Sequence, residues 1–228
     1  MKKIQFNLVP WAMALFTALM LGCEPQSEVK KPEEPQTPPN FTLVQNALLE
    51  YYNSGEYLKQ LNAVAQEAMD YLESASVTPG KSVLVLDIDD TSVTNAEAFL
   101  KTKFCPDASW NTWLESAQAP AIKSVNDLYK MALNKGVGVV FITARGTSDI
   151  GFTEKNLVNA GYATYDTLIL QPPGGQYPTS AAFKTSMRQA LTKAGMEIIL
   201  NVGDQESDVS GGYAKKAFKL PNPFYFTK

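Results

Sequence analysis

The 228-residue sequence contains no histidine. This absence excludes a Ser-His-Asp triad, phosphohistidine chemistry and every metal site that depends on imidazole, so acid–base catalysis and metal binding fall to carboxylates, lysine or tyrosine. The two cysteines, Cys23 and Cys105, form no Cys-x-x-Cys pair, which excludes a thiolate zinc site. The net charge is only −3, so no basic excess indicates a nucleic-acid polymer as a partner.

The N-terminal residues have the layout of a secretory signal peptide, which we predict over residues 1–22. Lys2 and Lys3 precede an apolar run from residue 8 to residue 21 that is too short for a comfortable membrane span. The run ends in Met20-Leu21-Gly22-Cys23, which resembles the lipobox of bacterial lipoproteins. The resemblance implies cleavage before Cys23 and acylation of this residue. An ordinary signal peptide that happens to contain a cysteine is the alternative.

Residues 23–40 are rich in proline and charge, and they cannot bury a core. We expect an extended tether that holds the remaining domain, residues 41–228, on a lipid anchor. The expected location is the bacterial cell envelope, at the outer membrane, facing the periplasm or the cell surface. The sequence gives no indication of the oligomeric state.

The stretch from Val83 to Thr91 organises the remaining chain. Val83, Leu84, Val85 and Leu86 form an apolar run without alternation, which predicts a strand buried on both faces of a parallel sheet. Asp87, Asp89 and Asp90 follow directly. Three carboxylates at the edge of a core repel each other and lose water, and a divalent cation is the simplest compensation.

Strands and helices alternate along the domain. Residues 41–72 have helical spacing broken at Gly55, and further strands are predicted over 137–142, 167–171, 197–202 and 217–220, with helices over 124–134, 153–159 and 180–194. This order predicts an α/β fold with a doubly wound parallel sheet. About forty-five residues separate Thr91 from the next strand, far more than an ordinary connection. We expect a small helical cap built from residues 41–78 and 92–122.

Polar residues follow several of these strands at the same edge of the predicted sheet. They are Asp87 and Asp89, Thr143, Lys184 on the following helix, and Asp204 with Asp208. A carboxylate can attack phosphorus, and a second can protonate the leaving oxygen and later deprotonate water. A hydroxyl and a lysine can hold phosphoryl oxygens, and the remaining acids can hold Mg²⁺. The set predicts phosphoryl transfer.

These motifs resemble those of the haloacid dehalogenase (HAD) superfamily of phosphatases over roughly residues 83–226. Asp87-Ile88-Asp89-Asp90-Thr91 is similar to the motif D-x-D-x-T, Phe141-Ile142-Thr143 to the second motif, Lys184 to the third, and Gly203-Asp204 through Asp208 to the fourth. Residues 87–95 resemble the class C acid phosphatases, many of which are bacterial lipoproteins. The C-terminal part is closer to plant acid phosphatases and vegetative storage proteins of the same branch, subfamily IIIB.

The resemblance implies a role for each residue. Asp87 is implied as the nucleophile and Asp89 as the general acid and base. Asp87, the backbone carbonyl of Asp89, and Asp204 are implied as Mg²⁺ ligands, with Asp208 in or near that shell. Thr143 and Lys184 are implied to bind phosphate, with help from Arg145. The resemblance thus predicts an Mg²⁺-dependent acid phosphatase that hydrolyses phosphate monoesters, among them nucleoside 5′-monophosphates.

Other interpretations remain open from the residues alone. The acids after the strand could cap a helix, and a phospho-receiver signalling domain also combines acids, threonine and lysine. A catalytically weak binding or storage lipoprotein of the same fold is the main alternative function. The aromatic residues of the insert, Phe99, Phe104, Trp110 and Trp113, form either the core of the cap or a platform on which a flat substrate stacks.

Overall fold

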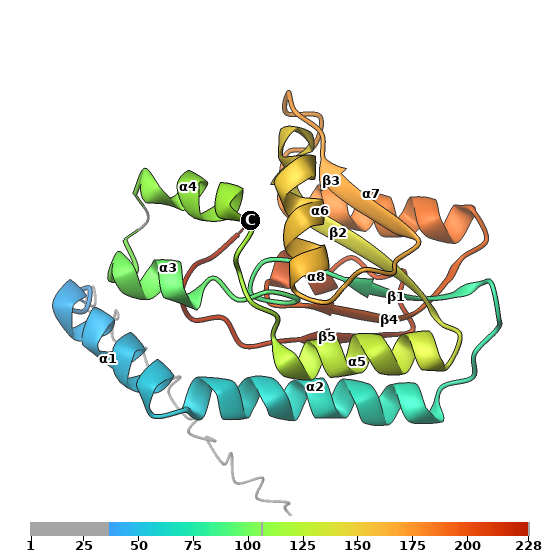
Figure 1. Ribbon diagram of the computed structural model, residues 1–228, viewed down its shortest axis with the longest axis horizontal. Coiled ribbons are helices and arrows are strands. Elements are labelled where there is room, and N and C mark those ends of the chain that lie inside the picture. Colours follow the sequence, from blue (N-terminus) through green and yellow to red (C-terminus); the bar gives the residue numbers. More distant parts are fainter. Residues whose placement is uncertain (1–36, 106, 228) are drawn as a thin grey trace, which may run out of the picture. The chain divides into compact units, whose positions relative to one another are not determined.

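Five parallel strands form the centre of the computed structural model, which describes residues 37–105 and 107–227 (Figure 1). The strands are β1 (Ser82–Leu86), β2 (Gly138–Gly146), β3 (Thr167–Gln171), β4 (Glu197–Gly203) and β5 (Lys216–Lys219), in the order β3-β2-β1-β4-β5. β1 is the middle strand and all of its residues are buried. The apolar run before Asp87 is therefore a strand covered on both faces, as its lack of alternation predicts.

Helices cover both faces of the sheet. On one face, α2 (Glu56–Ser74) and α5 (Lys123–Asn134) contact each other and enclose a core that includes Leu84 and Leu86 of β1. On the other face, Phe183 and Leu191 of α7 (Ser180–Lys193) share a second core with Val83 and Val85 of β1. Residues of β2 and β4 complete this core. Successive residues of β1 thus point into two different cores. The doubly wound parallel fold expected from the sequence is confirmed.

The remaining helices precede β1 in the sequence or lie in the connections between strands. They are α1 (Phe41–Asn53), α3 (Ala96–Lys101), α4 (Ser109–Ser116), α6 (Ile150–Asn159), α8 (Glu206–Val209) and the single turn η1 (Thr147–Asp149). α1 and α2 meet at Gly55, whose φ of +81° is a left-handed conformation that suits glycine. The predicted break in the helical N-terminal segment is therefore a turn between two helices.

The insert after Thr91 is a closed excursion that carries α3 and α4 (Figure 1). Its two ends are joined, since Ile122 donates a 3.0 Å backbone hydrogen bond to Ser92 and Thr94 donates one of 2.9 Å to Pro120. The far side of the insert is supported by contacts between α4 and α6. The chain therefore leaves and re-enters the sheet layer at the same place, and the small helical cap predicted for residues 92–122 lies beside the carboxyl edge.

One element expected in the cap has a different place. α2 falls within residues 41–78, but it packs against α5 and contacts β4 and β5. Its buried residues include Leu61, Ala68 and Leu72, which join the core on the face of the sheet. The apolar stripe of α2 is satisfied by the sheet, so this helix belongs to the layer that covers it.

The predicted signal peptide, Cys23 and nearly all of the predicted tether lie outside the described residues. Residues 39–228 form one compact unit. Among the helices that the structure describes, none combines the length and the apolar character needed to cross a bilayer.

Candidate active site

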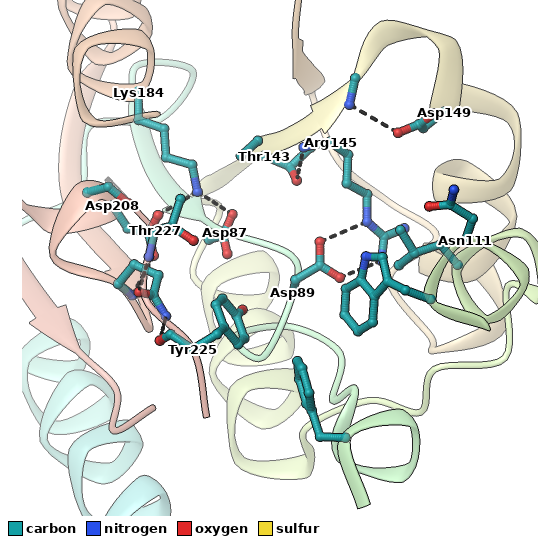
Figure 2. A pocket seen from close by; sticks show the side chains of 17 residues that line it. Asp87, Asp89, Asn111, Thr143, Arg145, Asp149, Lys184, Asp208, Tyr225 and Thr227 are labelled. Atoms are coloured by element: carbon teal, nitrogen blue, oxygen red, sulfur yellow. Dashed lines mark hydrogen bonds and ion pairs between the residues drawn. The ribbon is translucent and has the colours of Figure 1, made fainter. Parts of the chain in front are cut away.

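The three acids in the turn after β1 point in two directions: Asp87 and Asp89 face a cavity, and Asp90 faces the backbone before α3. Asp87 continues the sheet, because its N–H donates to the carbonyl of Val202 at 3.1 Å. Asp87 and Asp89 both line a cavity at the carboxyl edge (Figure 2). Asp90 has a left-handed φ of +51°, and its Oδ1 accepts the backbone N–H of Asn95 at 2.9 Å, next to the start of α3. Asp90 thus binds the backbone just before α3 without capping that helix, whereas Asp208 caps the start of α8 by accepting the N–H of Gln205.

The end of β4 brings a second pair of acids to the same place. Carboxylate oxygens of Asp87, Asp204 and Asp208 all lie within 4.8 Å of one another. Thr91 donates a 2.9 Å hydrogen bond to Oδ1 of Asp204, which ties the turn after β1 to the turn after β4. Burial raises the pKa of Asp204, and the nearby charge of Asp208 raises it further.

Lys184 of α7 reaches this acid cluster from the other face of the sheet. Its Nζ lies 2.5 Å from an oxygen of Asp87 and 2.5 Å from an oxygen of Asp208 (Figure 2). Burial opposes the charge of the ammonium, but the two carboxylates outweigh it and raise the pKa of Lys184. Lys184 is therefore a permanently charged cation beside the expected nucleophile, and it links the turn after β1 to the turn after β4.

Asp89 and Arg145 form a two-pronged ion pair in which Arg145 is buried and Asp89 is half-buried. Nε of Arg145 donates to Oδ2 of Asp89 at 2.9 Å, and Nη2 donates to Oδ1 at 2.7 Å. Burial alone would raise the pKa of Asp89, but the guanidinium outweighs it and lowers this pKa. Arg145 was expected beside a phosphate; in this structure its fork is occupied by Asp89, and Nη1 donates to Thr153.

Thr143 lies on β2 and lines the same cavity as Lys184 (Figure 2). Its Oγ1 accepts the backbone N–H of Arg145 at 3.1 Å, so the hydroxyl proton is free to point into the cavity. The structure thus brings together all of the residues that the sequence suggested for catalysis, phosphate binding and metal binding in the described part of the chain. They are Asp87, Asp89, Thr143, Arg145, Lys184, Asp204 and Asp208.

The acids exceed the cations that neutralise them. Arg145 and Lys184 are the cations that pair with these acids among the described residues. Asp90 and Asp204 are buried without such a partner, and burial together with neighbouring carboxylates raises the pKa of Asp90 to about 7. Hard carboxylate oxygens that converge within 4.8 Å fit a divalent cation, which would supply the missing positive charge. The donor set therefore suits a divalent metal.

The cavity beside this cluster has a volume of about 490 Å³ and two kinds of wall. Its floor carries the charged residues, and its outer wall comes from the insert and from the segment after β5. Phe99, Trp110 and Tyr225 form an aromatic side, and Phe99 and Tyr225 are stacked with ring centroids 5.4 Å apart. Asn111, which follows Trp110 on α4, and Asp149 add polar side chains to the wall of the cavity (Figure 2). The insert therefore completes the cavity that the strand ends begin.

Several polar residues of the site were not expected from the sequence. Asn222 and Gln205 each donate a 2.6 Å hydrogen bond to Oδ2 of Asp204. Ser207 is only 3% exposed and lines the cavity, and no described residue supplies a partner for its Oγ. Tyr225 directs its ring toward Asp87 and Asp89 (Figure 2). Asn222 and Tyr225 follow the last strand, where no local pattern distinguishes a site residue from a loop residue.

Known proteins place this chain in a family. Residues 23–228 match the model of the HAD superfamily, subfamily IIIB (acid phosphatase). Acid phosphatase 1 of Solanum lycopersicum is 31% identical over 183 residues, which cover 78% of this chain and 72% of that protein. The stem 28 kDa glycoprotein of Glycine max is also 31% identical, over 79% of this chain and 73% of the relative.

A solved structure has the same fold. The class C acid phosphatase from Bacillus anthracis aligns with a TM-score of 0.66 at 25% identity, over 81% of this chain and 86% of that chain. A second structure of that enzyme, with tungstate bound, aligns with a TM-score of 0.61. The protein described here therefore belongs to the subfamily IIIB acid phosphatases of the HAD superfamily and is a phosphoric monoester hydrolase.

Proposed function

We propose that the protein hydrolyses phosphate monoesters through a covalent aspartyl-phosphate on Asp87. The observation that carries this proposal is the position of Asp87, between the ammonium of Lys184 and the acid cluster at the floor of the cavity. A carboxylate there is exposed to a bound phosphate, while Lys184 offsets the charge of both partners.

The reaction has two balanced steps. An oxygen of Asp87 attacks phosphorus, the bond from phosphorus to the leaving oxygen breaks, and Asp89 gives a proton to that oxygen. Because Arg145 lowers the pKa of Asp89, Asp89 takes up this proton when the bound phosphate adds its negative charge to the site and raises that pKa again. Water then attacks the phosphorus of the aspartyl-phosphate and gives a proton to the Asp89 carboxylate. This second step releases inorganic phosphate and restores Asp87. Thr143 and Lys184 hold phosphoryl oxygens throughout.

We infer that the divalent metal is Mg²⁺, held by Asp87, Asp204, Asp208 and the backbone carbonyl of Asp89. Bound there, Mg²⁺ would supply positive charge to the phosphoryl oxygens. The oxygen-only donor set and its excess negative charge support this assignment. The side chain of Asp89 remains paired with Arg145, which leaves its backbone carbonyl as the group available to a metal.

The substrate that fits the cavity has a flat leaving group. Trp110, Phe99 and Tyr225 offer aromatic faces, and stacking of a base on such a face is worth about 1–3 kcal/mol. The polar side chains of Asn111 and Asp149 suit hydroxyl groups. We therefore infer a preference for aromatic or nucleoside 5′-monophosphates over small aliphatic ones. Trp113 and Phe104, considered as platforms from the sequence, pack elsewhere.

Asp87→Asn is the decisive variant, since an amide neither attacks phosphorus nor ligates a cation well. We expect turnover of p-nitrophenyl phosphate to vanish in this variant and in wild type treated with EDTA. Wild-type protein quenched during turnover should carry one phosphate, detected by mass spectrometry, that Asp87→Asn lacks. Turnover by Asp87→Asn would reject covalent catalysis at this residue. No turnover by the wild-type protein with Mg²⁺ would favour the storage alternative.

The substrate preference has its own test. We expect kcat/KM for AMP to exceed that for glycerol phosphate by about 10-fold or more, and Trp110→Ala to reduce this ratio. Equal values for both substrates in wild type would exclude stacking as a source of specificity.

A further inference from the structure

Trp113 of α4 makes a contact that its sequence context does not suggest. Its indole Nε1 donates a 2.7 Å hydrogen bond to Oδ1 of Asn95. Asn95 is fully buried and immediately precedes α3, at the base of the insert. The neighbouring Trp110 lines the cavity, whereas Trp113 binds the turn beneath it. The two tryptophans of the insert therefore have different tasks.

The side-chain amide of Asn95 also binds two of the acids in the turn after β1. Its Nδ2 donates to Oδ1 of Asp89 at 2.9 Å and to Oδ2 of Asp90 at 3.2 Å. An asparagine amide has a donor end and an acceptor end, and only the donor end is compatible with two carboxylates. The indole N–H can only donate, so it selects the amide orientation in which the oxygen faces Trp113 and the NH₂ group faces the acids.

Asp89 is thereby held from two sides. Arg145 on β2 donates two hydrogen bonds to it, at 2.9 and 2.7 Å, and Asn95 donates a third from the insert. The two-pronged pair with Arg145 already restricts the carboxylate, and the amide of Asn95 adds a donor from a different element. The amide fixes the oxygen Oδ1, to which both Asn95 and Arg145 donate.

We propose that Trp113 and Asn95 are positioning residues that set the carboxyl group of Asp89 for proton transfer to the leaving oxygen. The inference rests on the proposed function, in which Asp89 is the general acid. These residues connect the cap to the reaction without touching the substrate. Trp113 of α4 orients the amide of Asn95, and this amide orients Asp89.

Proton donation matters only for leaving groups that need a proton. The p-nitrophenolate ion leaves without one, whereas the oxygen of glycerol or of a ribose 5′-carbon must be protonated as its bond to phosphorus breaks. The value of kcat/KM reports the steps up to departure of the leaving group. A misplaced Asp89 therefore lowers kcat/KM for alkyl phosphates and spares p-nitrophenyl phosphate, while a general weakening of the fold lowers both.

Trp113→Phe removes the indole N–H and keeps an aromatic ring, and it is measured on p-nitrophenyl, phenyl and glycerol phosphates. We expect a loss of about 10–100-fold in kcat/KM for glycerol phosphate, part of the 10²–10⁴-fold worth of general acid–base catalysis, and less than about 2-fold for p-nitrophenyl phosphate. Asn95→Ser, which removes the amide itself, should show the same dependence on the leaving group. Tyr129→Phe is the control. It removes the 2.9 Å hydrogen bond that Tyr129 of α5 donates to the carbonyl of Thr164, outside the residues that line the cavity.

A uniform loss over the substrate series in both variants, or no loss in either, would overturn the inference. Asp87→Asn separates this failure from failure of the proposed function. If the wild-type protein is active, Asp87→Asn is inactive, and Trp113→Phe and Asn95→Ser lose activity equally on all three substrates, then only the positioning role of Trp113 and Asn95 is wrong. If the wild-type protein turns over none of the three substrates with Mg²⁺, both are wrong.

Discussion

The buried hydroxyl group of Ser207 has no hydrogen-bond partner among the residues that the structure describes. A buried hydroxyl without a partner costs free energy, so its presence beside the cavity floor suggests that a ligand completes it. We predict that Ser207→Ala does not lower the melting temperature but weakens competitive inhibition by inorganic phosphate about 10-fold, the scale of one hydrogen bond to a charged group.

Ser124→Ala is the matched control for this prediction. Its Oγ also has no partner among the described residues, and it lies on α5, outside the residues that line the cavity. The inhibition constant for phosphate, measured with p-nitrophenyl phosphate as substrate, should not move in this variant. An unchanged constant in Ser207→Ala would remove Ser207 from the phosphate site.

At the scale of single residues, the sequence was informative where chemistry and position coincide. Asp87, Asp89 and Asp204 were predictable because carboxylates directly after buried strands are costly unless a ligand or a cation offsets their charge. The pairing of Arg145 with Asp89 was not predictable, since a guanidinium suits a phosphate and a carboxylate equally well. Ser207 resembles any serine in a turn, and only its burial reveals it.

Among the elements, α7 supports the turn after β4 through one buried side chain. Arg188 is 1% exposed and donates to the backbone carbonyls of Asp208, Ser210 and Gly212. Asp208 is itself paired with Lys184, one turn earlier on the same helix. α7 therefore fixes both Lys184 and the backbone of Asp208, the acid that Lys184 contacts.

We predict that Arg188→Met lowers the free energy of unfolding by at least about 2 kcal/mol, because several buried carbonyls lose their donor at once. Urea unfolding followed by circular dichroism measures this change. Lys193→Met, at the exposed end of the same helix, is the control and should stay within about 0.5 kcal/mol of wild type. Equal effects of the two substitutions would refute a special role for Arg188.

The regular elements were largely predictable, since hydrophobic periodicity reports burial directly. The strand predicted over 197–202 corresponds to β4, which extends one residue further to Gly203. The helix predicted over 180–194 corresponds to α7, which ends one residue earlier. The place of α2 was not predictable, because an amphipathic helix has the same pattern whether it covers a sheet or a cavity. The segment after β5 supplies Asn222 and Tyr225 through tertiary contacts that carry no periodic signal.

For the whole molecule, the excess of buried acid should make stability depend on metal. Folding brings the carboxylates of Asp87, Asp204 and Asp208 together, and a cation that binds only the folded state stabilises it. We predict that saturating Mg²⁺ raises the melting temperature by about 5–10 °C, and that EDTA reverses the rise. Asp204→Asn should abolish most of this shift. A melting temperature that ignores Mg²⁺ would contradict the proposed metal site.

Location in the cell is a separate property of the whole chain. We propose that Cys23 carries the lipid anchor, on the resemblance of residues 20–23 to a lipobox. Cys23→Ser should then move the protein from the membrane fraction to the released fraction, because two or more acyl chains are what give stable anchoring. Cys105→Ser is the control. Membrane association that survives Cys23→Ser would exclude this anchor.

The central position of β1 has a consequence for the order in which the protein is made. β1 pairs with β2 and β4, both of which follow it in the sequence, and Lys184 comes 97 residues after Asp87. At about 5–20 residues per second, the ribosome completes that distance in roughly 5–20 s. A nascent chain therefore carries Asp87 early, hydrated and without Lys184 and the acids after β4. The repulsion that Asp204 and Asp208 add to Asp87 arises only when β4 docks, so this part of the cost of assembling the site falls late in folding.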